Sequence, residues 1–236
     1  MTTETTTTTA AMTVTVPAAF IDAAMCAVSK EETRYYLKGV FLDARGFIAA
    51  TNGHMAFAAR VNDTFKLNDI RPAYDSAGNC LPGLIVPDTA IAQASKAAGR
   101  AKGLDYVFER DTLGQWFIQY GAARVHFTPV DGSFPDWARI IPAAPDTLIA
   151  AHYQPQYIAA LGKMAQALRD GKKDAATSFR LHQNADNPAL VTFCRKLDSV
   201  SDTPGPRTDC CAVLIPMRTK AADWAEPRFT DTFLKA

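Results

Sequence analysis

The hydrophobic pattern along the chain contains three stretches with helical spacing. In each stretch, apolar residues and alanines recur every three or four positions, which is typical of a helix with one buried face. Each stretch also carries a proline near its start, where the missing N–H costs nothing because the first helical turn leaves that group unpaired. The pattern therefore predicts helices over residues 16–30, 86–103 and 154–173, begun by Pro17, Pro87 and Pro155.

Short runs of aromatic and β-branched residues, separated by Gly, Asn, Asp or Pro, follow each predicted helix. Such runs are typical of antiparallel strands. Pro87 follows Pro17 by 70 positions and Pro155 follows Pro87 by 68, so the period is nearly constant. A constant period indicates a repeated supersecondary unit. We therefore expect one unit, a helix with three or four antiparallel strands, to occur three times and to bury an apolar sheet face under its helix.

The dipeptide Asn52-Gly53 lies between two alternating apolar runs. It is typical of a type I′ hairpin, because both central residues of that turn need positive φ. We therefore expect His54 to begin the second strand of a hairpin. The remaining histidines are scattered along the sequence, at His126, His152 and His182. Without partners at a useful spacing, catalysis or metal binding by His54 is disfavoured.

Composition narrows the class of protein. The 236 residues are 48% hydrophobic and 21% charged, with a net charge of +1, as in an ordinary globular protein of one or two domains. No apolar run is long enough to span a membrane, and no secretory signal is visible, so a cytoplasmic location is expected. The five cysteines show no CxxC spacing, which disfavours a zinc site and a disulfide framework. We expect neither a metal nor a cofactor.

Positive charge gathers on the second and third predicted helices, although the whole chain is almost neutral. If these helices share one surface, its cations would face phosphates and hold a duplex without reading its sequence. The alternative is that the charges only solvate exposed helix faces. The candidate DNA-facing residues are Lys96, Arg100, Lys102, Lys163, Arg169, Lys172 and Lys173.

Four segments together resemble the bacterial DNA polymerase III beta sliding clamp family. They are TRYYLKGVFLD at 33–43, ATNGHMA at 50–56, VDGSFPDWARIIP at 130–142 and CAVLIPMRT at 211–219. The first two resemble parts of that family's middle domain, the third its link to the last domain, and the fourth its C-terminus. The order and spacing also fit over about residues 14–219.

The resemblance implies an α+β DNA-clamp fold, in which each domain consists of two halves made of a helix and an antiparallel sheet. It implies about one and a half such domains, with no counterpart of the family's first domain, so the usual head-to-tail dimer contact is not expected. The expected divisions are a disordered Thr-rich arm at 1–13, a complete clamp-like domain at 14–142, a half domain at 143–219 and a tail at 220–236.

The resemblance also implies a hydrophobic pocket that receives short motifs of polymerases and other replication or repair proteins. Gly53 would let a peptide approach the backbone, and His54 would form part of the rim. Met55 stands where the family usually has Arg, and Asn52 where it has Asp. The implied pocket residues are Leu37, Thr51, Gly53, His54, Pro135, Arg139, Ile140, Val213, Ile215, Pro216 and Met217. The alternative for the apolar members, Val213 above all, is a purely structural place in the core.

These observations favour a non-enzymatic processivity factor that binds duplex DNA and clamp-motif proteins as a homo-oligomer. Four copies of three units would supply the dozen helices that surround a duplex. A second hypothesis is a decoy or adaptor that binds the same peptides without forming a ring, with the tail at 220–236 as a ligand for the pocket. A third is an enzyme that uses His54 with Asp43, or Asp131 with Asp136, but no catalytic motif supports it. The partners, the oligomeric state and the need for a clamp loader stay open.

Overall fold

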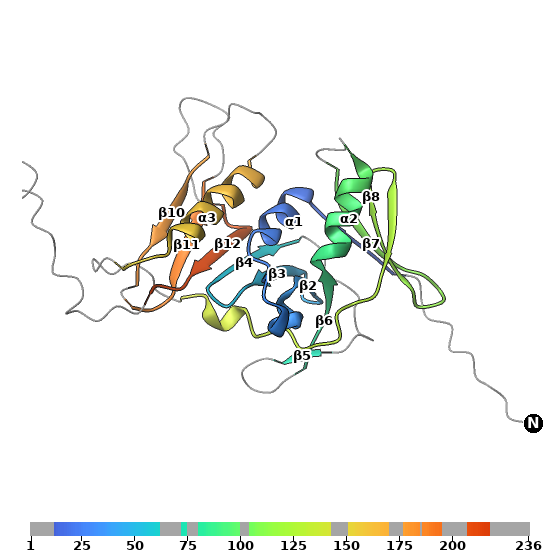
Figure 1. The fold of residues 1–236 in the computed structure, drawn as a ribbon, viewed down its shortest axis with the longest axis horizontal. Coiled ribbons are helices and arrows are strands. Elements are labelled where there is room, and N and C mark those ends of the chain that lie inside the picture. Colours follow the sequence, from blue (N-terminus) through green and yellow to red (C-terminus); the bar gives the residue numbers. More distant parts are fainter. Residues whose placement is uncertain are drawn as a thin grey trace, which may run out of the picture.

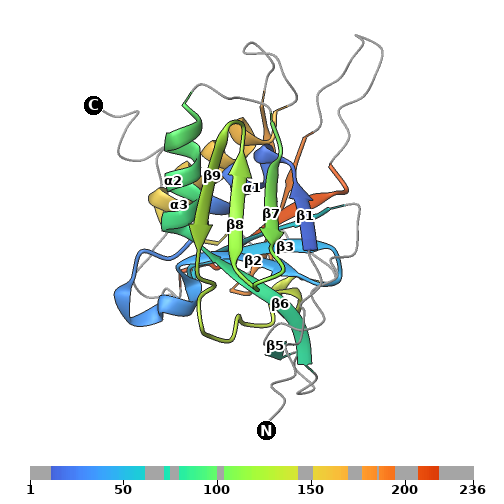
Figure 2. The same cartoon turned by 90° about the vertical axis from the view of Figure 1, so that its right-hand side faces the viewer.

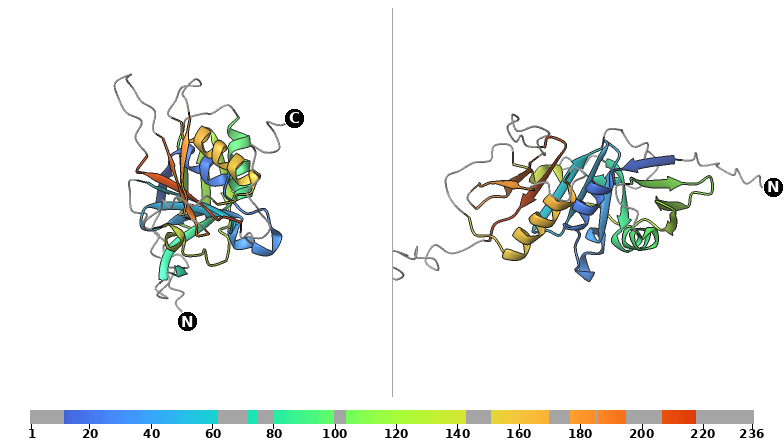
Figure 3. Two further views of the ribbon diagram at one scale, coloured as in Figure 1. Left: turned by 90° about the vertical axis from the view of Figure 1, so that its left-hand side faces the viewer. Right: turned by 90° about the horizontal axis from the view of Figure 1, so that it is seen from above.

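A computed structural model describes residues 12–61, 72–74, 80–99, 104–142, 151–169, 177–184, 186–194 and 207–217. Figure 1 shows three helices in a row along one side of two antiparallel sheets, in the order α3, α1, α2, and the view from above in Figure 3 gives the same order. Within these residues, no helix is long and apolar enough to cross a membrane.

The three helices begin at the predicted prolines. They are α1 (Ala18–Met25), α2 (Asp88–Ala98) and α3 (Pro155–Ala167). Pro17 and Pro87 are the N-cap residues of α1 and α2, whereas Pro155 is the first helical residue of α3, after Gln154. Gly99 ends α2 with a φ of 63°, a conformation that glycine adopts without steric cost. The helix α1 ends earlier than predicted, because Cys26 and Ala27 form a turn. The described residues also include two short 3₁₀ helices, η1 (Glu32–Leu37) and η2 (Ala138–Ile140).

The strands form a four-stranded sheet, in the order β1-β7-β8-β9, and an eight-stranded sheet, in the order β10-β11-β12-β4-β3-β2-β6-β5. All strand pairs inside these sheets are antiparallel. Figure 2 shows the four-stranded sheet broadside. The strands are β1 (Met12–Val16), β2 (Gly39–Asp43), β3 (Phe47–Thr51), β4 (Met55–Arg60), β5 (Pro72–Tyr74), β6 (Cys80–Pro87), β7 (Tyr106–Arg110), β8 (Trp116–Tyr120), β9 (Ala123–Phe127), β10 (Phe179–His182), β11 (Ala189–Phe193) and β12 (Cys210–Leu214).

The repeated unit is confirmed as a helix followed by three consecutive antiparallel strands, which we call a module. The first module is α1 with β2, β3 and β4; the second is α2 with β7, β8 and β9; the third is α3 with β10, β11 and β12. The first two modules exchange the strand that comes just before each helix. β1 leads into α1 but pairs with β7, and β6 leads into α2 but pairs with β2. This exchange makes the first two modules one complete domain.

The third module joins the first through strand pairing. β12 pairs with β4, from Cys210 opposite Ala59 to Leu214 opposite Met55, so one sheet runs through both modules. The helices α1 and α3 also contact each other on the same side of this sheet. Arg207 connects the two modules, because its guanidinium lies 5.7 Å from the ring centre of Phe20 in α1. Its Nη1 also donates a hydrogen bond to Leu168 O (2.8 Å) within the third module. The first and third modules therefore form a continuous surface.

Two hydrophobic clusters hold the fold together. The larger one lies between the helices and the sheets and includes fully buried residues from all three modules, such as Ile21, Phe108 and Leu161. The smaller one includes Phe41 and Trp137 and lies on the other face of the first module's strands. In β2, Val40 and Leu42 belong to the larger cluster and Phe41 to the smaller one, as the two-residue period of a strand requires. Both faces of β2 are therefore covered, which explains its nearly continuous apolar sequence.

Two predicted boundaries shift in the structure. β1 begins at Met12, so its first two residues fall inside the arm predicted at 1–13. The hairpin turn is also one residue later than expected: Asn52 N–H donates to Met55 O (3.2 Å), which makes Gly53 and His54 the central pair. His54 therefore lies in the turn, and β4 begins at Met55. The predicted tail at 220–236 lies outside the described residues, and the proposed division at 142/143 stays a prediction.

Candidate functional site

The turn between β3 and β4 is rigid because side chains hold its backbone. Thr51 Oγ1 donates to Met55 O (2.8 Å) and accepts from Gly53 N–H (3.1 Å). The side-chain oxygen of Asn52 accepts from His54 N–H (2.9 Å) and from Met55 N–H (3.0 Å). Gly53 has a φ of 87°, which an L-residue with a Cβ rarely adopts. The turn therefore depends on Asn52 as a hydrogen-bond acceptor and on Gly53 as a glycine.

The end of β12 runs beside this turn. Ile215 N–H donates to His54 O (2.9 Å), just after the last strand pair, Leu214 opposite Met55. Met217 N–H donates to His152 O (2.8 Å), so the segment 215–217 is fixed at both ends. Met217 is 41% exposed. An adaptable thioether thus lies at the surface of the join between the first and third modules.

The segment that contains η2 is anchored on the opposite face of the sheet. Trp137 Nε1 donates to Asp43 Oδ2 (3.1 Å), and Arg45 binds the same carboxylate through Nε (2.9 Å to Oδ1) and Nη2 (2.5 Å to Oδ2). Asp43 is completely buried, so these donors replace the water that its charge has lost. A small cavity of about 10 Å³ remains between Trp137 and Ile141 on one side and β4 and β12 on the other.

The eleven predicted pocket residues belong to η1, the end of β3 and the turn after it, the segment around η2, and the end of β12, and they differ in exposure. Gly53, His54, Pro135, Arg139 and Met217 are exposed, and Ile140 and Ile215 are half-buried. The other four are buried: Leu37, Thr51, Val213 and Pro216. Val213 borders the small cavity and pairs with Ala56, which supports the alternative that Val213 is a core residue and not a peptide contact. The buried four can support the walls, and only the other seven can touch a peptide.

A larger groove lies on the helix side of the same turn. It encloses about 670 Å³ and is bordered by the C-terminal end of α1, the first half of α3 and the turn at His54. The imidazole of His54 stacks on the ring of Tyr157, with 5.4 Å between ring centres and 20° between planes. Sequence reasoning missed Tyr157, because its place in α3 looked like any half-exposed helix position. Only the packing of α3 beside the β3–β4 turn shows that it contributes to a site.

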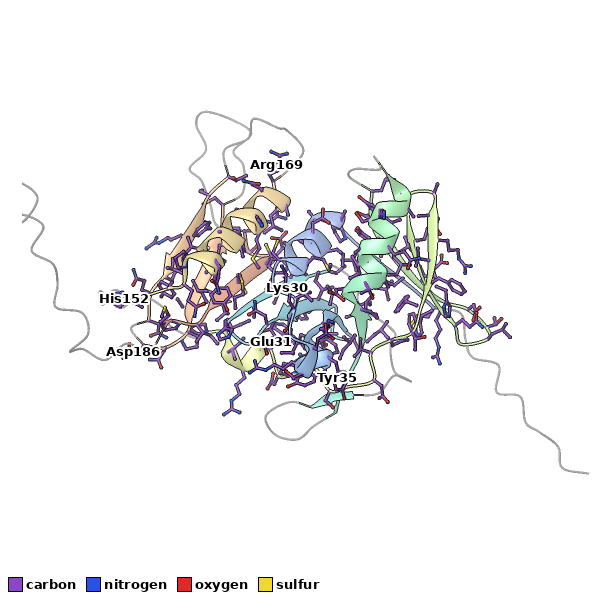
Figure 4. All side chains as sticks on the ribbon, in the orientation of Figure 1. Lys30, Glu31, Tyr35, His152, Arg169 and Asp186 are labelled. Atoms are coloured by element: carbon purple, nitrogen blue, oxygen red, sulfur yellow. The ribbon has the colours of Figure 1, made fainter. Side chains whose placement is uncertain are left out.

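The groove contains charged groups of both signs. Lys30, Glu31 and Lys163 border it, and Figure 4 shows Lys30 and Glu31 next to each other below α1. Glu31 Oε2 also lies 3.3 Å from Nε of Arg34, whose guanidinium covers the space over Gly53. Burial raises the pKa of the Cys26 thiol, although the nearby Lys163 opposes this effect. The thiol is therefore protonated at neutral pH and acts as a packing group.

Three of the seven predicted DNA-facing residues belong to the described part. Lys96 on α2 and Lys163 on α3 are exposed, and so is Arg169 just after α3. Figure 4 shows Arg169 beyond the C-terminal end of α3. The remaining four, Arg100, Lys102, Lys172 and Lys173, lie outside the described residues. A basic helical face therefore stays a prediction that rests on the row of helices.

The geometry does not support a catalytic pair of His54 and Asp43. The carboxylate of Asp43 is occupied by Arg45 and Trp137, and its partners do not include His54. No group of three metal-ligating side chains occurs in the part of the chain that the structure describes. Burial raises the pKa of Cys210 to about 12 and that of Cys211 to about 11, so neither thiol is a nucleophile at neutral pH.

Comparisons with known proteins agree with this arrangement. The chain is 32% identical over 132 residues to the beta sliding clamp of Caulobacter vibrioides, a match that covers 52% of this chain and 31% of that protein. It is 27% identical over 139 residues to the beta sliding clamp of Pseudomonas aeruginosa, covering 57% and 34%. The matches thus span about a third of the curated relatives' length. No family model matches the chain.

Solved structures show the same fold. A sliding clamp from Bartonella birtlesii bound to griselimycin superposes with a TM-score of 0.56 at 17% identity, over 88% of this chain and 66% of that one. A sliding clamp from Pseudomonas aeruginosa bound to griselimycin gives a TM-score of 0.57 at 16% identity, over 93% and 68%. The resemblance to beta sliding clamps is therefore confirmed over about half of the sequence, and the α+β clamp fold is confirmed over most of the chain.

Proposed function

We propose that this protein is a sliding-clamp-like processivity factor. It binds partner proteins through the pocket at the β4–β12 join and encircles duplex DNA as an oligomer, without catalysing a reaction. The observation that carries this proposal is the hydrogen bond from Ile215 N–H to His54 O (2.9 Å), which holds the β3–β4 turn against the segment 215–217. This bond joins two of the four segments that carry the sequence resemblance.

The chemistry of the join suits a short peptide with apolar anchors. Met217 and Ile215 offer apolar surface at one side, and Ile140 lies in η2 near the other. The stacked pair of His54 and Tyr157 extends this surface into the groove beside α3. Such exposed, adaptable or aromatic side chains around fixed backbone are typical of the few contacts that dominate peptide affinity. We infer that a polymerase or another replication or repair protein inserts a clamp-binding motif here.

The row of helices supports the second part of the proposal. Sequence-independent contacts need only cations along a surface, and α2 and α3 carry exposed lysines there. We expect the protein to act in the cytoplasm, with the replication machinery.

Peptide binding is the first test. The probe is a fluorescent peptide that carries the clamp-binding motif of a bacterial replicative polymerase, titrated by anisotropy. Met217→Ala should raise the Kd about five- to tenfold, since truncation of a central apolar contact typically costs more than about 1 kcal/mol. The matched control is Leu113→Ala, an equally apolar change at an 81% exposed position in the turn between β7 and β8. Equal affinities for the wild type and both variants would contradict the pocket.

Retention on DNA is the second test. The protein is assembled on a nicked circular plasmid and on the same plasmid after linearisation, and each sample is gel-filtered at raised salt. A ring should remain on the circle and slide off the linear molecule, because topology and not charge holds it. Peptide binding without retention on the circle would favour the decoy or adaptor over the processivity factor.

A further inference from the structure

The first two modules define what covers the open side of a module. The strand before each helix pairs with the first strand of the other module, and the registers correspond. Val16 of β1 lies opposite Tyr106 of β7, and Val86 of β6 lies opposite Val40 of β2. Val16 and Val86 each come directly before an N-cap residue. The exchange is therefore reciprocal, and both strands pair in the same way relative to the helix that follows them.

In the described part of the chain, the third module lacks this cover. Among these residues, β10 pairs only with β11 and forms one edge of the eight-stranded sheet. Its inward residues Phe179 and Leu181 correspond to Val40 and Leu42, because Leu181 lies opposite Val191 just as Leu42 lies opposite Ile48. Val40 and Leu42 are fully buried, whereas Phe179 and Leu181 are only half-buried. The edge of β10 thus exposes apolar surface that the first module hides.

The three helices differ in the same way in the exposure of one isoleucine that each of them carries. Ile21, Ile91 and Ile158 each occupy the fourth position after the N-cap of their helix. Their side chains are 0%, 2% and 36% exposed, respectively. All three helices thus carry an isoleucine at this position, but neighbouring residues bury it only in the first two.

The segment before α3 lacks a strand partner of the kind that β1 and β6 have. Residues 151–154 form no strand in the described structure. Ala151 N–H donates instead to the side-chain oxygen of Gln183 (2.7 Å), a substitute for a backbone partner. The hydroxyl of Tyr153 is buried and has no hydrogen-bond partner among the described residues. Tyr153 comes directly before the N-cap residue Gln154, as Val16 and Val86 do before theirs.

We propose that a second copy of this chain completes the third module by reciprocal strand exchange. The segment 151–153 of each copy pairs with β10 of the other. The register of β1 and β6 places Tyr153 opposite Phe179 of the second copy, and Ala151 opposite Leu181 of the second copy. Ile158 then becomes buried near the twofold axis, as Ile21 and Ile91 are buried inside the complete domain. Figure 4 shows His152, within this segment, at the outer end of the molecule opposite the four-stranded sheet, where a second copy has access.

This arrangement is closed and isologous, because each copy offers the same strand and the same edge. Two third modules form a complete clamp-like domain, so the dimer holds three such domains. Two dimers contain twelve modules, which agrees with the dozen helices expected around a duplex. This inference concerns how copies of the chain assemble. It rests on the proposed function only for what the assembly does, since peptide binding at the β4–β12 join does not require the dimer.

The test measures the mass of the full-length protein by sedimentation velocity over a wide range of concentrations. The wild type should be a dimer or a larger even assembly. Ile158→Glu should shift it to the monomer, because a carboxylate cannot be buried unpaired in an apolar interface. Leu113→Glu, which places the same charge at a different exposed apolar residue, should leave the assembly unchanged. A monomeric wild type, or an assembly that Ile158→Glu leaves intact, would overturn the proposal.

A crosslinking experiment covers the case in which Ile158→Glu does not fold. The double variant Ala151→Cys, Leu181→Cys should form an intermolecular disulfide under mild oxidation, since directly opposite strand residues bring their Cβ atoms close enough. The out-of-register variant Ala151→Cys, Arg180→Cys should not. Equal crosslinking of both variants, or of neither, would contradict the strand exchange. The clamp-binding peptide should bind Ile158→Glu as it binds the wild type, so failure of the assembly and failure of the pocket are separate results.

Discussion

The complete domain at residues 12–127 and the third module at residues 151–217 have the same local architecture but different surroundings. In both, a helix is followed by three antiparallel strands, and an isoleucine occupies the fourth position after the N-cap of the helix. In the domain, each module supplies the strand that covers the other, and Ile21 is fully buried. In the third module that strand is missing from the described residues, and Ile158 is 36% exposed. The difference shows that burial here is decided by the neighbouring module and not by the sequence of the helix.

The comparison also separates two kinds of contact made by the first module. Towards the second module it exchanges strands around the larger hydrophobic cluster. Towards the third it pairs β4 with β12 and leaves a groove between α1 and α3. Both contacts bury residues of the larger cluster, but the second also leaves apolar and aromatic side chains at the surface. A binding site is therefore expected at the second contact.

The largest expected effect is a loss of stability when the corresponding isoleucines of the two regions are truncated. Ile21→Ala should lower the free energy of unfolding by about 2–5 kcal/mol, because it removes buried methyl groups and leaves a cavity. Ile158→Ala, the same change at the corresponding exposed position, should cost well under about 1 kcal/mol in the monomer. Urea unfolding at low protein concentration measures both. Similar losses would mean that the two helices have equivalent surroundings after all.

A smaller effect should come from the anchor of η2. Trp137→Phe removes the indole N–H that donates to Asp43, a completely buried carboxylate. The expected loss is about 1–3 kcal/mol, less than for a broken charge pair, because Arg45 still binds the same group. The clamp-binding peptide should also bind more weakly, since Ile140 is then less well fixed. Unchanged unfolding and unchanged peptide affinity would show that η2 is held by other contacts.

The turn at the join should tolerate substitution less than its exposure suggests. Gly53→Ala places a Cβ at a φ of 87° and within 2.6 Å of Nη1 of Arg34. Arg34 can move, so the backbone conformation decides the cost, which should be about 1 kcal/mol. The control is Gly162→Ala in α3, where a new Cβ meets nothing within 4 Å. That variant should be neutral or stabilising, because alanine has the higher helix propensity. Equal effects of the two variants on thermal unfolding would contradict the role of Gly53.

The smallest effect concerns pH and the link between the modules. Arg207 donates two hydrogen bonds to the carboxylate of Asp209, through Nε (2.8 Å) and Nη2 (2.7 Å), and this holds the pKa of Asp209 below its ordinary value. Since the folded pKa is the lower one, the stabilisation exists at neutral pH. It disappears as the pH falls below the ordinary Asp value of about 3.9 and through the folded pKa. The carboxylate is 42% exposed, so the contribution should stay below about 1 kcal/mol.

The check is the difference in unfolding free energy between the wild type and Asp209→Asn, measured in urea at neutral pH and again at a pH below the folded pKa. The wild type should be more stable at neutral pH, and the difference should vanish in acid. A difference that is constant with pH would assign the effect of the variant to something other than the charge of Asp209.

The sequence predicted the features that local chemistry decides. Proline at Pro17, Pro87 and Pro155 marked the helix starts within one residue, and the near-constant spacing revealed the repeat. It misplaced the β3–β4 turn by one residue, because the side chain of Asn52 accepts two backbone hydrogen bonds and moves the turn onward, a preference that the Asn-Gly pattern does not show.

Features decided by contacts between modules were not visible in the sequence. Tyr157 follows the same helical spacing as residues that only pack, and its stack on His54 exists because α3 lies beside the β3–β4 turn. Likewise, Ile21 and Ile158 look alike in the sequence. Their different exposure depends on which strands cover them, and strand exchange between modules leaves no local signature.

The most direct measurement of the central claim is amide hydrogen exchange in β2, β7 and β10, followed as a function of protein concentration. The account holds that the third module is the same unit with its partner side uncovered. It predicts that β2 and β7 are protected at every concentration, whereas β10 exchanges rapidly in dilute solution and becomes protected as copies associate. Protection of β10 that equals that of β2 and β7 in the dilute monomer would contradict the account, and so would fast exchange in β10 at all concentrations.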